Sequence, residues 1–180
     1  LVFHDVVNLR HAEKAAAAGV DGLILLTAGA GGHTGWLNPF AFLKAVRAIF
    51  DGPIAIAGGL TDGRQLRALE LLGADLGYVG TPFIATTESL APQAYKDSLV
   101  AAGIDEVLET DVVSGMRANF LRPSLEAEGF LTPEGRPERP TDVTKAAWDR
   151  VWSAGHGVGE IAAVRPAAEL VAAFAAEYGS

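Results

Sequence analysis

The stretch Gly19-Val20-Asp21-Gly22-Leu23 recurs almost unchanged as Gly73-Ala74-Asp75-Leu76-Gly77. In both copies a glycine ends a helical pattern, and an apolar strand pattern begins within a few residues. A junction of this kind, repeated along a chain, is typical of βα units whose strands pair in parallel. The strand patterns are apolar without alternation, as in strands that are covered on both faces. The sequence therefore predicts an α/β fold with a parallel sheet.

Four such units precede residue 105. The predicted strands comprise residues 2–7, 22–26, 53–57 and 76–79. Each strand is followed by a helical pattern, and these patterns end at Gly19, Gly52, Gly73 and Gly103.

The second helix has the clearest start signal, because Asn38 is a suitable N-cap and Pro39 a suitable first helical residue. Its apolar residues follow at helical spacing. We expect one buried face made of Phe40, Leu43, Val46 and Phe50.

Strand–helix alternation is compatible with a doubly wound sheet or with a (β/α)8 barrel. A barrel has eight units in about 250 residues, so four units correspond to about half of one. The chain has no initiator methionine and opens within a strand pattern, and we expect further barrel units to precede it.

We assign residues 1–105 to the C-terminal half of a barrel. Residues 106–180 form a C-terminal extension, with an irregular segment at 130–143 and helices at 142–152 and 166–178.

The amino-acid composition argues against several classes of protein, including nucleic-acid-binding and membrane proteins. The chain has 180 residues, 49% hydrophobic and 20% charged, with a net charge of −8. Because basic residues are not clustered, we expect neither nucleic acid nor a membrane surface as a partner. No apolar run approaches the roughly 20 residues that span a bilayer. The absence of cysteine excludes disulfides and thiolate nucleophiles, and we expect a cytoplasmic protein.

Three glycine-rich loops follow the ends of consecutive predicted strands. They are residues 29–35 (Gly29-Ala30-Gly31-Gly32-His33-Thr34-Gly35), Gly58-Gly59 and Gly80-Thr81. Each loop alone could be an ordinary turn that connects a strand to a helix. In a barrel, however, all three meet at the face where active sites lie, and the loops after the last two strands commonly bind phosphate. The second and third loops together therefore favour a phosphate site, to which the Thr81 hydroxyl could add a donor.

His33 is the one titratable side chain in the first loop, and it can exchange protons near neutral pH. A dinucleotide-binding motif G-x-G-x-x-G that begins at Gly29 is a weaker interpretation than a phosphate site, because Thr34 occupies the position of its last glycine. The remaining histidines have no spacing typical of metal ligands, so no metal is expected. We expect His4 to be a structural histidine, the rim of the site being the alternative. His11 is expected to be solvated, and His156 to lie either near the pocket or at the surface.

Several motifs together resemble the nitronate monooxygenase family, formerly called 2-nitropropane dioxygenases. They are Ala30-Gly31-Gly32-His33-Thr34-Gly35, Ala57-Gly58-Gly59-Leu60-Thr61-Asp62-Gly63-Arg64, Leu72-Gly73-Ala74-Asp75, Val79-Gly80-Thr81-Pro82-Phe83-Ile84-Ala85-Thr86-Thr87-Glu88-Ser89, Ser114-Gly115-Met116-Arg117-Ala118-Asn119-Phe120-Leu121-Arg122 and Ala154-Gly155-His156-Gly157-Val158-Gly159. The resemblance spans nearly the whole chain. It implies an FMN-dependent (β/α)8 barrel, of which this chain is about the C-terminal half.

By this resemblance, His33 is the catalytic histidine near the reactive edge of the flavin. The residues implied to hold FMN are Gly31, Gly32, Gly58, Gly59, Tyr78, Val79, Gly80 and Thr81. Two residues depart from the family pattern: Leu26 stands where some relatives carry a polar residue, and His156 stands where many carry glutamine.

The resemblance implies a small-molecule enzyme that oxidises alkyl nitronates with O2. The alternative is an NAD(P)H-dependent flavin reductase or dehydrogenase acting on an enoyl- or CoA-type thioester. A third hypothesis is a half-barrel that serves as an oligomerisation module, and a homodimer is compatible with each of these. In the segment 114–122, Arg117, Asn119 and Arg122 form a polar set within an apolar frame. We expect structural ion pairs in this set to tie the extension to the barrel.

Overall fold

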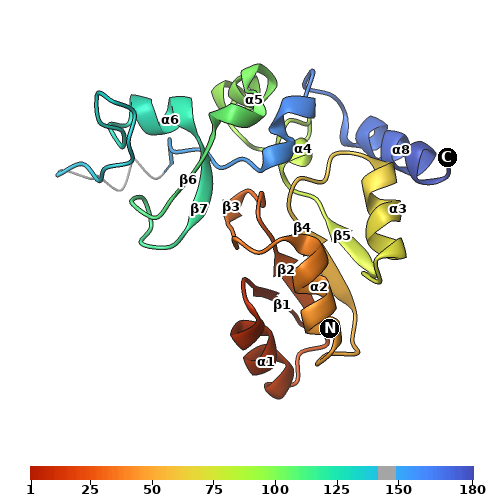
Figure 1. Ribbon diagram of the computed structural model, residues 1–180. Helices are drawn as coiled ribbons and strands as arrows, with labels where there is room; N and C mark the ends of the chain where they lie inside the picture. Colours follow the sequence, from red (N-terminus) through yellow and green to blue (C-terminus); the bar gives the residue numbers. More distant parts are fainter. Residues whose placement is uncertain (142–148) are drawn as a thin grey trace.

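The computed structural model describes residues 1–141 and 149–180 (Figure 1). The helix expected at 142–152 lies mostly outside the described residues, and residues 149–152 form a turn.

Four parallel strands form the main sheet, in the order β1-β2-β4-β5. Their bounds are β1 Phe3–Val6, β2 Gly22–Leu26, β4 Ile54–Ala57 and β5 Leu76–Tyr78. Each strand pairs with its neighbour in a regular register, in which Leu23 lies opposite His4 on one side and Ile54 on the other. The four βα units expected from the sequence are thus present, and the order of strands in the sheet follows their order in the chain.

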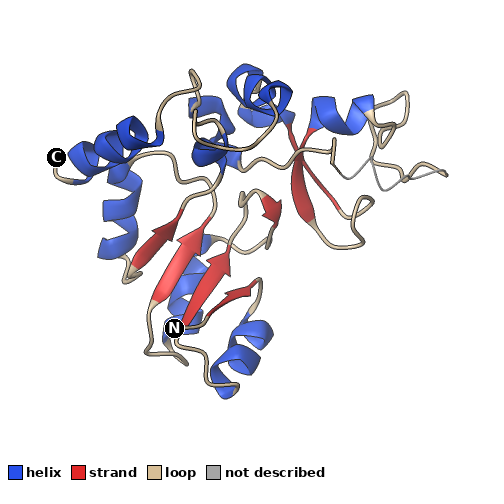
Figure 2. Ribbon diagram, turned by 180° about the vertical axis from the view of Figure 1, so that it is seen from behind, coloured by secondary structure: helices blue, strands red, loops and turns tan. Residues whose placement is uncertain are grey.

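Three helices cover one face of this sheet: α1 Leu9–Ala17, α2 Pro39–Arg47 and α3 Gly63–Leu71. Figure 2 shows the opposite face, with the strands in front of α2. Leu23, Leu25 and Ile56 point from the strands into the core beneath the helices, where Phe42 and Val46 meet them. Ile24 and Leu26 belong to a separate cluster on the other side of the alternating strand.

The buried face of α2 differs from the expected one. Phe42, Leu43 and Val46 are buried, whereas Phe40 is 60% exposed and Phe50 lies beyond the helix. Asn38 caps the helix as predicted, accepting a hydrogen bond from the Phe40 N–H at 3.0 Å. Because helical side chains lean toward the N-terminus of their helix, Phe40 in the first turn extends past the packed region. The helix also ends at Arg47, well before Gly52.

Strand β5 contradicts the expectation that every strand is covered on both faces. Leu76 and Tyr78 are 52% and 54% exposed, because β5 is an edge strand that pairs with β4 on one side. The packing of Gly77 is nevertheless close, since a Cβ at this position would lie 2.1 Å from Leu66 Cδ2.

A second sheet joins the first glycine loop to the C-terminal part of the chain. It is antiparallel, in the order β3-β7-β6, with bounds β3 Gly32–His33, β6 Val107–Thr110 and β7 Ala118–Leu121. We call the hairpin β6–β7 the arm; Figure 1 shows it beside β3. The expected tie of arm to barrel through ion pairs is wrong for Arg117, which pairs with Glu109 within the arm at 3.1 Å. Arg122 contacts the Gly135 carbonyl oxygen, also within the extension.

The other helices of the described residues lie near the carboxyl ends of the main-sheet strands and near the arm (Figure 1). They are α4 Thr81–Ile84, α5 Gln93–Ala101, η1 Ile104–Glu106, α6 Arg122–Ala127, η2 His156–Glu160 and α8 Ala167–Tyr178. The C-terminal α8 packs on α3 so closely that a Cβ at Gly63 would lie 2.0 Å from the Phe174 carbonyl oxygen. Within the described ranges, every helix is too short or too polar to cross a bilayer. The domain division at residue 105 stays a prediction.

Candidate functional site

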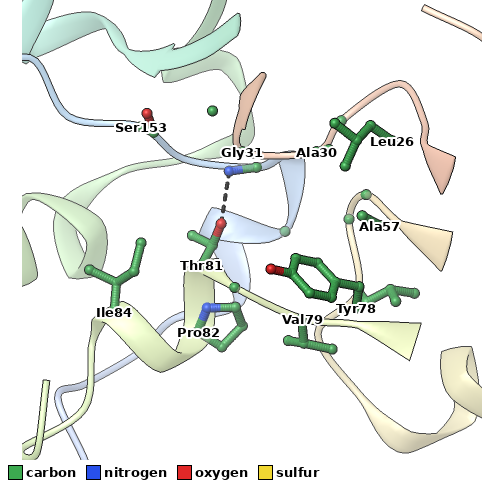
Figure 3. A pocket seen from close by; sticks show the side chains of 18 residues that line it. Leu26, Ala30, Gly31, Ala57, Tyr78, Val79, Thr81, Pro82, Ile84 and Ser153 are labelled. Atoms are coloured by element: carbon green, nitrogen blue, oxygen red, sulfur yellow. Dashed lines mark hydrogen bonds between the residues drawn. The ribbon is translucent and has the colours of Figure 1, made fainter. Parts of the chain in front are cut away.

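The three glycine-rich loops meet around one hollow of about 160 Å³, together with a fourth loop from the C-terminal part of the chain (Figure 3). Eight of the eighteen residues that line the hollow are glycines. All eight residues that the sequence assigned to a cofactor lie here: Gly31, Gly32, Gly58, Gly59, Tyr78, Val79, Gly80 and Thr81. The structure brings them together, and their role in binding stays a prediction.

Close contact between loops fixes one wall of the hollow. The Thr81 Oγ1 atom is buried and accepts a hydrogen bond from the Gly155 N–H at 2.9 Å (Figure 3). A Cβ at Gly31 would lie 2.8 Å from the Gly155 nitrogen. Glycine is therefore required at Gly31 for the loops to approach each other. Because Thr81 Oγ1 acts as an acceptor toward Gly155, its own hydrogen can be donated into the hollow.

The opposite wall contains glycines of two kinds. Gly58 and Gly59 have φ values of +137° and +69°, which side-chain-bearing residues rarely adopt. Gly80 has an ordinary φ of −115°, and among the described residues no heavy atom other than those of its chain neighbours lies within 4 Å of the position of a Cβ. No contact within the described part of the chain requires glycine at position 80. A group bound in the hollow would explain it, since that group would occupy the space a side chain would fill.

The residues that line the hollow could bind an anion through uncharged hydrogen-bond donors. Within the described part of the chain, no Lys or Arg side chain lines it. Hydroxyl groups come from Tyr78, Thr81 and Ser153, and the Tyr78 ring points toward Thr81 in Figure 3. Glycine-rich backbone can present N–H groups to an anion without side-chain obstruction. A phosphate group attached to a larger molecule fits these properties.

His33 faces a different hollow, of about 430 Å³. It lies on β3 directly after Gly32, and successive residues of a strand point to opposite faces. Gly32 therefore lines the first hollow and His33 lines the second. The lining of the second hollow comprises Asp5, Val7, Asn8, His11, His33, Thr34, Gly35, Trp36, Met116 and Arg117. The two hollows adjoin through the backbone of one short strand.

Asn119 is a residue of the site that the sequence did not single out correctly. It is 1% exposed, and its Nδ2 donates a hydrogen bond to the Ala30 carbonyl oxygen at 2.8 Å. This contact, rather than an ion pair, joins β7 to the first glycine loop. A polar residue in the otherwise apolar sequence Ala118-Asn119-Phe120-Leu121 was the available signal.

The fourth loop is held from behind by aromatic residues. The Tyr95 hydroxyl donates to the Ser153 carbonyl oxygen, and the Tyr95 ring stacks on Trp152 with centroids 5.2 Å apart. Burial raises the pKa of Tyr95 to about 12, so the hydroxyl keeps its proton and remains a donor. This arrangement fixes the backbone that leads from Ser153 to Gly155.

The other histidines lie outside the first hollow. The backbone N–H of His156 donates to the Gly29 carbonyl oxygen at 3.0 Å, while its exposed side chain lies beside Gly29. His11 is exposed, as expected, but His4 is also exposed on β1 and is not the buried structural residue we expected. Among the described residues, no group of three His, Asp or Glu side chains could hold a metal ion.

A parallel βα sheet with a glycine-rich hollow at the carboxyl ends of its strands is the arrangement of α/β enzymes of the barrel type. Residues 2–177 match the model of the nitronate monooxygenase family. The chain belongs to this family of flavin-dependent oxidoreductases.

The similar curated proteins include enzymes with two kinds of name. The chain is 33% identical to the (3aS,4S,5R,7aS)-5-hydroxy-7a-methyl-1-oxo-octahydro-1H-indene-4-carboxyl-CoA dehydrogenase of Rhodococcus jostii (strain RHA1), with 85% of the chain and 44% of the relative aligned. It is 32% identical to a nitronate monooxygenase of Paraburkholderia phytofirmans, over 92% of the chain and 51% of the relative. The chain thus spans about half the length of the curated relatives it matches.

A solved structure, nitroalkane oxidase from Streptomyces ansochromogenes, superposes with a TM-score of 0.77 at 30% identity. The superposition covers 99% of this chain and 57% of that structure. It confirms the predicted fold class, an α/β barrel of which this chain forms a part.

Proposed function

We propose that the first hollow holds the phosphate end of FMN. Its open space at Gly80, its hydroxyl groups and its glycine-rich walls support this assignment. The residues that would hold the cofactor are the eight predicted from the sequence, with Ser153 and Gly155 completing the wall. When bound, FMN would accept electrons from the substrate and pass them to O2, chemistry that the side chains alone do not provide.

We further propose that the protein oxidises alkyl nitronates with O2. In a balanced reaction, two nitronates and one O2 give two carbonyl compounds and two nitrites, each carbon–nitrogen bond being replaced by a carbon–oxygen double bond. The observation that carries this proposal is the position of His33, one residue from the cofactor hollow and facing a larger hollow of its own. A substrate bound in the second hollow would contact His33, one residue along β3 from the wall of the cofactor hollow.

His33 would bind the anionic substrate or hold a proton at its imidazole nitrogens. The antiparallel pairing of His33 with Ala118 fixes its backbone. The buried contact from Asn119 to Ala30 fixes the loop that precedes it. Trp36 and Met116, both lining the second hollow, would restrict water around the reacting group.

The purified protein tests the proposal directly. We expect bound flavin in its visible spectrum, together with O2 consumption and nitrite release when ethylnitronate is added under air. Protein that binds flavin yet releases no nitrite from any alkyl nitronate would refute nitronate oxidation and leave the cofactor site intact. Protein free of flavin after reconstitution with FMN would refute both.

The similarity to a CoA dehydrogenase favours one alternative, an NAD(P)H-dependent flavin reductase or dehydrogenase acting on an enoyl- or CoA-type thioester. In that reaction His33 would exchange a proton with carbon. Oxidation of NAD(P)H that depends on an enoyl thioester, without nitrite release from nitronates, would select this alternative.

A further inference from the structure

The second hollow combines an apolar wall with cationic and titratable groups. Trp36 and Met116 lie on it and are 70% and 54% exposed in this chain. Val7 adds a smaller apolar surface beside them. Large apolar side chains that gather around a concave surface are typical of a binding site. His33 and Arg117 lie in the polar part of the same hollow, which also includes Asp5, Asn8, His11 and Thr34.

The turn of the arm holds Met116 and Arg117 in place. The Gly115 N–H donates to the Asp111 carbonyl oxygen at 2.7 Å, and Gly115 has a φ of +78°. The Ser114 hydroxyl donates to the Met116 carbonyl oxygen at 2.9 Å. These contacts close the turn, so Met116 does not sit on a free loop.

The same turn is joined to the strand that carries His33. The Thr34 N–H donates to the Arg117 carbonyl oxygen at 3.2 Å. The Arg117 side chain pairs with Glu109 at 3.1 Å and remains 63% exposed. The guanidinium therefore keeps donors available for a second anion, while Asp5 adds the one acidic group among the residues that line the hollow.

The size of the hollow bears on the substrate. Its volume of about 430 Å³ lies within the range of about 300–1,000 Å³ in which proteins bind whole organic ligands. A one- or two-carbon nitronate would leave most of the apolar wall without contact. An apolar chain of several carbons would cover Trp36 and Met116 while its anionic end remained near His33.

We propose that Trp36 and Met116 are specificity-determining residues that select nitronates with an apolar chain of about four to eight carbons. The inference rests on the proposed function for the identity of the anionic group. The apolar preference itself rests on the lining of the hollow. It can therefore be tested separately, with anions that cannot be oxidised.

Alkyl carboxylates are suitable probes, because a carboxylate has the planar, two-oxygen anionic shape of a nitronate. Their dissociation constants for the flavin-loaded protein are measured calorimetrically from acetate to octanoate. We expect the affinity to rise about two- to fourfold per methylene, the upper value corresponding to about 0.8 kcal/mol per buried CH2. Equal affinity along the series would overturn the proposal.

Variants locate the effect in the named residues. In Met116→Ala and Trp36→Ala the chain-length dependence should fall by half or more, whereas the volume-conserving Met116→Leu should keep it. Leu90→Ala, which removes a fully exposed apolar side chain outside the hollow, should also keep it. A slope that is unchanged in both alanine variants would show that the chain binds elsewhere.

The substrate series separates this inference from the proposed function. The kcat/KM for nitronates of ethane, butane and hexane should increase with length in the parent protein and level off in Met116→Ala. Nitronate oxidation with equal kcat/KM for all three would overturn the inference alone. Length-dependent carboxylate binding without any nitronate oxidation would overturn the proposed function alone.

Discussion

The Asn119 amide nitrogen lies 2.8 Å from the Ala30 carbonyl oxygen, in a contact that is shielded from solvent. The two residues are 89 positions apart: Asn119 lies on β7, and Ala30 lies in the loop between β2 and β3. The Asn119 Oδ1 is buried without a hydrogen-bond partner in the described part of the chain. Asn119 thus contributes a donor to the first glycine loop.

Asn119→Asp should lower the free energy of unfolding by about 1–3 kcal/mol, because it replaces the donor to a buried carbonyl with an acceptor. It should also weaken flavin retention, since the loop from Ala30 to Gly32 lines the cofactor hollow. Thermal unfolding and the visible spectrum measure these effects. Asn38→Asp is the matched control, because Asn38 acts as an acceptor toward Phe40 and aspartate can replace it. Equal stability of the two variants would contradict a stabilising role of the Asn119 donor.

Gly80→Ala should leave stability within about 0.5 kcal/mol of the parent, since its φ is ordinary and a Cβ meets no protein atom. Flavin binding should fall at least tenfold, because the methyl group would occupy space assigned to the cofactor. The control is Gly103→Ala, where a Cβ also meets no protein atom but the residue lies outside the hollow. Full flavin retention in Gly80→Ala would show that the phosphate does not approach this residue.

His33→Asn should retain flavin, because His33 does not line the cofactor hollow. Its kcat/KM for a nitronate should fall by about 10²- to 10⁴-fold, the usual contribution of a proton-transferring group. A rise in KM at unchanged kcat would instead mean that His33 only binds the anion. His4→Asn, an exposed histidine on β1, is the control. Parental turnover in His33→Asn would eliminate the proposed role.

Asp75 provides a pH-dependent prediction about stability. A hydrogen bond from the Ile54 N–H, followed by one from Arg47, lowers the pKa of Asp75 below its ordinary value. The carboxylate therefore stabilises the fold above the ordinary aspartate pKa of about 4, and this contribution is lost as the pH falls through the lowered pKa.

Asp75→Asn should accordingly cost about 1 kcal/mol at pH 7, a modest value because the side chain is half exposed. Urea unfolding at pH 7 and at pH 3 should show the difference between parent and variant shrinking in acid. Asp51→Asn, at an exposed position, is the control. A difference that is equal at both pH values would contradict the ionic contribution.

Local sequence signals predicted the barrel part of the fold well. The Asn38 cap, the glycines after the helices and the apolar strands each depend on contacts within a few residues, so their patterns are visible in the sequence. The exposed Phe40 and the edge position of Leu76 depend on where the sheet ends, which no local pattern records.

The site was predicted in part, for the same physical reason. The glycines of the first hollow stood at the ends of predicted strands, so a barrel fold brings them together. The pairing of His33 with Ala118 joins segments that are distant in the chain, and it places the histidine in a second hollow. The arginines near Asn119 suggested ion pairs in this segment. The buried hydrogen bond of Asn119 to Ala30 instead depends on the long-range pairing of β3 with β7, which the sequence does not show.

The short strand β3 separates two hollows that are lined by different parts of the chain. The cofactor hollow is built by loops of the main sheet, whereas the arm supplies Met116 and Arg117 to the hollow of His33. Substitutions in the turn of the arm would change the second hollow without altering the glycines that we propose hold the cofactor. Under the proposed function, one cofactor site would therefore be compatible with different substrates, selected by a few residues of a single hairpin.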